Sequence, residues 1–113
     1  MADCLFCRII KGEIPSRQVY EDERIFAFED IQPGAPTHIL LVPKRHLEDL
    51  AHATAEDAAL LGELQLKAAD LARQRGLANG FRTVLNVGPD AGQSVFHLHL
   101  HLLGGRRLAW PPG

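Results

Sequence analysis

Three histidines alternate with leucines near the end of the chain, in the segment HLHLHLL that runs from His97 to Leu103. If this segment is a β-strand, side chains two residues apart share a face, so His97, His99 and His101 lie together and the leucines face the other way. Near pH 7 a neutral imidazole is both a nucleophile and a proton carrier. The row therefore predicts a nucleophilic histidine whose neighbours move protons to a leaving group.

Two other roles compete for the histidines of this row. A lone histidine on a strand is usually a hydrogen-bonded surface or core residue, but three in register on one face favour a functional site. A His-x-His pair is also a good chelate for zinc. However, a rise of about 3.4 Å per residue separates His97 from His101 by roughly 13 Å, so one ion cannot bind all three. At least one imidazole must have another function.

The loop that precedes the row, residues 88–94, contains groups that suit a phosphate. Gly88 and Gly92 give it a flexible backbone, and Gln93 and Ser94 supply an amide and a hydroxyl close to the imidazoles. Glycine and aspartate also form ordinary turns, so the loop favours phosphate binding only in combination with the histidines.

Cys4 and Cys7 form a Cys-x-x-Cys pair and are the chain's two cysteines. A reducing compartment argues against a structural disulfide between them. A thioredoxin-like redox pair should follow a strand and open a helix, and no strand is predicted before this pair. Two buried free thiols are one remaining interpretation. The other is a tetrahedral zinc site completed by two histidines from elsewhere in the fold.

The elements that must position these residues follow from the hydrophobic periodicity of the chain. In order, they are a short helix within residues 1–12, a hairpin of strands 18–21 and 24–29, a strand at 38–43, a helix from Thr54 to Gly76, and strands at 81–87 and 96–103. The run 38–43 is continuously apolar, which is typical of a central strand buried on both faces. Thr54 and Asp57 resemble a capping box. The pattern predicts an α+β fold with a largely antiparallel sheet.

The composition excludes several classes of protein. The chain has 113 residues, 46% hydrophobic and 23% charged, which is the size of one soluble globular domain. No stretch approaches the ~20 apolar residues of a membrane span. Lys and Arg number 12 against 14 Asp and Glu, so no basic surface for nucleic acid is expected. No secretion signal is recognisable, and a cytoplasmic location is expected.

The segment from His97 to Leu103 has the form His-φ-His-φ-His-φ-φ, and on this motif the chain resembles the histidine triad (HIT) superfamily. The resemblance extends from Cys4 to the C-terminus, so residues 1–113 are expected to form a single HIT domain. The segments FEDIQPGAPTHILLVPKRH, FRTVLNVGPDAGQSVFHLHLHLLGGR and WPPG are similar to the Hint branch, the histidine triad nucleotide-binding proteins. The fragile histidine triad and diphosphate-cleaving branches match less well.

The resemblance implies a homodimer in which two five-stranded sheets, each with one long and one short helix, join into one ten-stranded sheet. It also implies hydrolysis of the P–N bond of purine nucleoside 5′-phosphoramidates, such as AMP-amine conjugates, with no cofactor required for catalysis. His99 corresponds to the nucleophile that forms a nucleotidyl-histidine intermediate. The other catalytic positions implied by the resemblance are His97, His101, His38 and Ser94.

The same resemblance assigns the nucleotide contacts. Asp30 corresponds to the carboxylate that accepts both ribose hydroxyls, which is chemically apt. Phosphate and leaving-group contacts fall to Asn86, Gln93, Ser94, Val95, His99 and His101, and the apolar walls around the base fall to Phe6, Ile9, Phe28 and Ile31. Trp110 belongs to a C-terminal arm that approaches the partner's active site. Its two following prolines cannot join a helix or an interior strand.

Some bacterial members of the superfamily bind structural zinc through a cysteine pair and two histidines, and this chain matches them with Cys4, Cys7, His46 and His97. Animal Hint proteins lack these cysteines, so the quartet departs from the branch that the chain otherwise resembles. His52, near the start of the predicted helix, is expected to face solvent.

Two alternative functions stay open. A dinucleoside polyphosphate hydrolase would use the same nucleophile with a different leaving group. A nucleotide-binding interaction protein would have only incidental catalysis. The apolar base walls do not decide between adenine and guanine, and the sequence does not name the amine.

Overall fold

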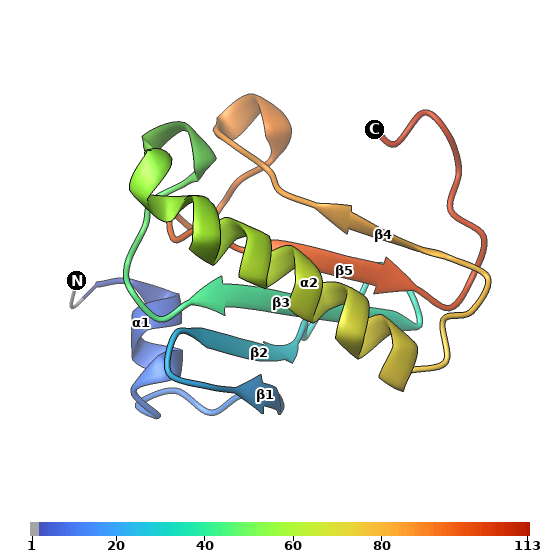
Figure 1. Cartoon of the computed structure of the whole chain (residues 1–113), viewed down its shortest axis with the longest axis horizontal. Helices are drawn as coiled ribbons and strands as arrows, with labels where there is room; N and C mark the ends of the chain where they lie inside the picture. The colour runs from blue at the N-terminus through green and yellow to red at the C-terminus, as the bar shows by residue number, and fades with distance from the viewer. Residues whose placement is uncertain (1–2) are drawn as a thin grey trace.

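The computed structural model describes residues 3–113, which form an antiparallel sheet with a helix packed on each face (Figure 1). In chain order the elements are α1 Leu5–Ile10, β1 Gln18–Glu21, β2 Ile25–Glu29, β3 Thr37–Pro43, α2 Ala58–Gln74, β4 Phe81–Val84 and β5 Leu100–Gly104. Short 3-10 turns lie at Leu50–His52, Ala55–Asp57 and Pro89–Ala91. The predicted α+β class, with one long and one short helix, is confirmed.

The sheet has the strand order β1-β2-β3-β5-β4, and each neighbouring pair is antiparallel. All residues of the central strand β3 are buried, as predicted. Ile39 and Leu41 pack with α2 on one face of the sheet. Leu40 and Val42 pack with Phe6 of α1 on the other face. The sheet therefore separates two apolar cores.

Local side-chain bonds explain where the two helices begin. At α1, the Sγ of Cys4 accepts a hydrogen bond from the backbone N–H of Cys7 at 3.3 Å, so the cysteine pair itself caps the helix. At α2, Thr54 and Asp57 form the predicted capping box, although the first turn is a 3-10 turn. With 17 residues α2 is the longest helix among the described residues, and none of these helices is long and apolar enough to cross a membrane.

Two strands are shorter than predicted: β4 covers Phe81–Val84 instead of 81–87, and β5 covers Leu100–Gly104 instead of 96–103. For β5, the reason is that the backbone N–H of Leu98 donates to the carbonyl of Leu47, beyond the end of β3, at 2.6 Å. The chain before β5 therefore leaves the β3 ladder. The predicted alternation of histidines and leucines between the two faces is still present, because the leucines between the histidines pack beneath α2.

The segment after β5 passes β4 and continues to the C-terminus (Figure 1), and its last four residues form no helix or strand, as predicted. Arg82 on β4 holds this segment, because its Nη2 donates to the carbonyl of Ala109 at 2.9 Å. The adjacent Trp110 is 81% exposed. The tail therefore reaches the outer edge of the sheet with its aromatic ring uncovered.

Candidate functional site

The histidine row lies on the face of the sheet that α1 covers. The ring of His99 has its centroid 5.0 Å from that of His101, which in turn lies 5.2 Å from the ring of His38 on β3. Phe6 of α1 packs edge-on against His99, with centroids 5.0 Å apart. It packs in the same way against His97 at 6.0 Å. The row and the fourth histidine thus form one continuous group under α1.

His99 is oriented as a nucleophile. The residue is buried, and its Nδ1 lies 2.8 Å from the backbone carbonyl oxygen of His97. A carbonyl only accepts hydrogen bonds, so Nδ1 carries the proton and Nε2 keeps its lone pair. Burial lowers the pKa of His99, which keeps the ring neutral near pH 7. An unprotonated Nε2 is therefore available.

His38 and His101 form a pair whose proton positions follow from one backbone amide. The N–H of Gly34 donates to Nδ1 of His38 at 2.9 Å, so the proton of a neutral His38 lies on Nε2. Nε2 of His38 in turn donates to Nδ1 of His101 at 2.9 Å. The proton of His101 is then on its own Nε2, which is buried and has no hydrogen-bond partner among the described residues. Burial, with His99 and His38 nearby, lowers the pKa of His101 to about 4. This ring is a neutral hydrogen-bond donor.

Asp30 lies beside this pair. Its Oδ2 is 3.4 Å from Nε2 of His38, and its Oδ1 accepts the backbone N–H of Gln32 at 2.8 Å. The side chain is 20% exposed and lines the same cavity as His99 and His101. The carboxylate can accept hydroxyl hydrogen bonds there.

A cleft of about 320 Å³ opens over His99 and His101. Its lining combines apolar side chains with a few polar groups, a composition typical of small-molecule sites. Of the residues assigned from sequence, the cleft is lined by Phe6, Ile9, Phe28, Asp30, Ile31, Ser94, Val95, His99 and His101. Ile31 is 89% exposed at the rim. The structure therefore brings the base, ribose and phosphate candidates into one cavity.

Other assigned residues lie outside the lining of this cleft. Gln93 is buried and uses its side chain to hold the loop, accepting from the N–H of Gly88 at 2.9 Å and donating to the carbonyl of Glu48 at 3.0 Å. Asn86 follows β4 and is partly buried. Trp110 lies beside Arg82 on β4. Their roles toward a ligand stay predictions.

His52 faces solvent as expected, with 61% of its side chain exposed. Its Nδ1 lies 2.7 Å from Oδ1 of Asp49, so the residue is tied to its own turn.

The predicted zinc ligands converge at the start of α1. The ligand atoms of Cys4, Cys7, His46 and His97 all lie within 4.8 Å of one another. Nε2 of His97 donates to the carbonyl of Pro43 at 2.7 Å, which leaves the Nδ1 lone pair for the thiols. That Nδ1 is 3.3 Å from the sulfur of Cys4 and 3.5 Å from the sulfur of Cys7.

These separations fit a tetrahedral ion. Zinc with Zn–S of about 2.3 Å and Zn–N of about 2.0 Å holds its ligand atoms roughly 3.3–3.8 Å apart. The sulfur of Cys7 is also 3.5 Å from Nδ1 of His46. Two sulfurs and two imidazole nitrogens are the donor set of structural zinc sites.

Sequence reasoning did not identify Gly34 or the contact between Asp30 and His38. Gly34 stands between Pro33 and Pro36, a composition that signals only a loop. Which backbone amide faces an imidazole depends on how the loop folds over β3, and no residue pattern records this.

The chain is similar in sequence and structure to several known proteins. The family model described as HIT domain matches residues 11–108. The crystal structure of a HIT family hydrolase from Legionella pneumophila has a TM-score of 0.97 and 49% identity, covering 98% of this chain and 100% of that one. A histidine triad nucleotide-binding protein from Candida albicans has a TM-score of 0.82 and 33% identity, covering 96% and 83% of the two chains. A 14 kDa zinc-binding protein from Zea mays is 53% identical, over 96% of this chain and 87% of its own length.

Proposed function

The chain belongs to the HIT family, and from this premise we propose that it is a hydrolase that cleaves the P–N bond of purine nucleoside 5′-phosphoramidates. The names of its relatives, a hydrolase and a nucleotide-binding protein, support nucleotide hydrolysis in general. The observation that carries the proposal is the unprotonated Nε2 of His99 at the floor of a cleft with an apolar wall and a carboxylate.

The first chemical step is the attack of Nε2 of His99 on the α-phosphorus. A bond forms between Nε2 and phosphorus while the P–N bond of the substrate breaks, and its electron pair goes to the leaving nitrogen. That nitrogen takes a proton through the hydroxyl of Ser94, which lines the cleft and is exposed to water. The positive charge of the nucleotidyl-histidine is stabilised through Nδ1–H and the carbonyl of His97.

The second step reverses the first with water as the nucleophile. Water attacks the phosphorus and gives up a proton through the hydroxyl of Ser94, the bond to Nε2 breaks, and His99 recovers its lone pair as the nucleoside monophosphate leaves. His101 acts in both steps as a hydrogen-bond donor, because its Nε2–H has no other partner and can bind a phosphoryl oxygen. With a pKa of about 4 it seldom carries a second proton, so it stabilises charge instead of transferring protons.

Asp30 and the apolar side chains of the cleft would bind the ribose and the base of the substrate. A carboxylate among the residues that line the cleft suits the two ribose hydroxyls. Phe6, Ile9 and Phe28 are buried side chains that offer a flat apolar surface to a purine base.

We also propose that the protein is a homodimer joined through β4. This strand is the last of the sheet order and presents an unpaired edge. Phe81 on β4 is 43% exposed, and Trp110 next to this strand is 81% exposed. Pairing of two β4 edges would extend the sheet to ten strands and bring each tail toward the other protomer.

We propose that Cys4, Cys7, His46 and His97 hold a structural zinc ion. The ion would cross-link α1 to the chain before β5 and take no part in bond cleavage. The maize relative, a 14 kDa zinc-binding protein, supports this metal.

The test of the function is rapid-quench trapping with a radiolabelled nucleoside phosphoramidate. The wild-type chain should carry a labelled nucleotide on histidine, and His99→Ala should carry none and lose nearly all turnover. A normal adduct on His99→Ala would contradict the assignment. A panel that includes dinucleoside polyphosphates decides between the two hydrolase classes, because faster cleavage of a P–O–P bridge would replace the P–N proposal.

A further inference from the structure

Arg106, on the surface beyond β5, is linked to the catalytic histidines by a series of hydrogen bonds. Its Nη2 donates to the carbonyl of Gly34 at 2.7 Å. Gly34 is the residue whose N–H donates to Nδ1 of His38 and so fixes the protons of His38 and His101. A surface cation thus holds the residue that decides which nitrogen of His101 carries a proton.

The position of Gly34 needs such an anchor. Glycine has the greatest backbone freedom of all residues. Among the described residues, Gly34 takes part in no backbone-to-backbone hydrogen bond outside regular elements. Its carbonyl bond to Arg106 and its amide bond to His38 are the contacts that orient it.

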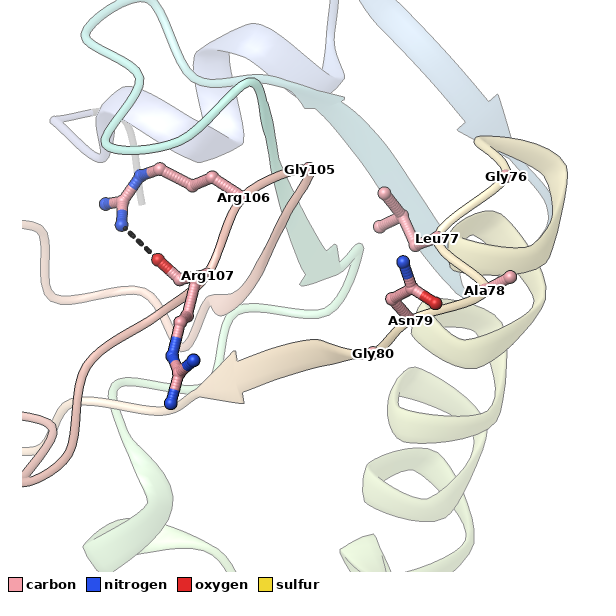
Figure 2. Close-up of a pocket in the computed structure, with 8 residues that line it drawn as sticks. All are labelled: Gly76, Leu77, Ala78, Asn79, Gly80, Gly105, Arg106 and Arg107. Carbon is pink, nitrogen blue, oxygen red and sulfur yellow. Dashed lines mark hydrogen bonds between the residues drawn. The ribbon is translucent and has the colours of Figure 1, made fainter.

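The fold is built to bring Arg106 to this point. Gly105 has φ of 95°, and a Cβ there would lie only 2.9 Å from Cβ of Pro36, so the chain after β5 passes tightly against the loop 31–36. Nη1 of Arg106 also donates to the carbonyl of Arg107 at 2.9 Å, which fixes the plane of the guanidinium group (Figure 2).

Figure 2 also shows the directions of the Arg106 and Arg107 side chains. Arg106 and Arg107 border a cavity of about 580 Å³ with the turn 76–80, but both guanidinium groups point away from that turn. The side chain of Arg107 donates no hydrogen bond to any described residue, so the neighbouring cation provides a matched control.

We propose that Arg106 is a positioning residue: by holding Gly34 it keeps His38 and His101 in the tautomers that leave the proton of His101 on Nε2, the atom without a hydrogen-bond partner among the described residues. The consequence for activity rests on the proposed function, whereas the tautomers can be measured without any substrate.

The experiment uses ¹⁵N-labelled protein and long-range ¹H–¹⁵N spectra of the histidine rings, together with steady-state kinetics. In the wild type and in Arg107→Ala, His38 and His101 should each show the neutral form with the proton on Nε2. In Arg106→Ala, a second tautomer of His38 should appear, kcat should fall about fivefold and KM should stay within about twofold. Arg106→Lys keeps one donor for Gly34 and should give an intermediate kcat.

Wild-type tautomers in Arg106→Ala would overturn the proposal, whether or not kcat falls. An equal loss of kcat in Arg107→Ala would overturn it too, because the loss of any positive charge at this surface would then explain the effect. If the wild type hydrolyses no phosphoramidate, the proposed function fails, while the comparison of spectra still decides the role of Arg106.

Discussion

Acidification should destabilise the fold through His101, and the pKa of this residue sets the size of the effect. Its pKa is about 4 in the folded chain, against about 6.5 when unfolded. Between these values the unfolded chain binds more protons than the folded one. The stabilising contribution of a neutral His101 is therefore complete above pH 6.5 and is lost as the pH falls toward 4.

The full difference between these pKa values corresponds to about 3.4 kcal/mol. His101 is only partly buried and faces an open cleft, so solvent screening reduces the effect to about 1.5 kcal/mol. For a chain of this size, that amounts to about 6 °C in Tm.

The assay is thermal unfolding by circular dichroism between pH 7.5 and 4.5, with His101→Gln as the control that cannot titrate. The Tm of the wild type minus that of the variant should fall by about 6 °C over this range. Other groups, including the cysteine–histidine cluster, titrate in both proteins and cancel in the difference. A difference that stays constant with pH would refute the buried neutral imidazole.

Two further predictions concern the zinc cluster and the tail. Replacing Cys4 and Cys7 by serine should remove one bound zinc per chain in metal analysis and lower Tm by roughly 10 °C. This is the stabilisation expected from an ion whose free concentration is about 100 times its Kd. Unchanged metal content and Tm would exclude the site. Deleting residues 110–113 should leave the dimer and His99 turnover intact but change the ratio of kcat/KM for alkyl and aryl phosphoramidates about threefold. An unchanged ratio would show that the tail does not touch the leaving group.

Much of the site could be predicted because period-two alternation is a strong signal. It assigned the histidines to one side and the leucines to the core beneath α2, and this holds even where the chain before Leu100 is not a strand. The exact strand bounds could not be predicted, since they depend on Leu98 bonding to Leu47 instead of β3. The tautomers of the histidines could not be predicted either, because they depend on single contacts such as the hydrogen bond from Gly34 to His38.

The central strand β3 has a consequence for how such a protein can change. The seven residues of β3 are all buried and alternate between the two faces of the sheet. Ile39 and Leu41 belong to the core beneath α2, and Leu40 between them lines the floor of the cleft. A substitution that enlarges the floor at Leu40 also leaves a void in the apolar cluster beneath α1. New substrate preferences should therefore arise at the rim, where Ile31 and Gln32 are exposed, and the residues of the floor should change more slowly. Directed-evolution libraries built on this scaffold are best confined to those rim positions.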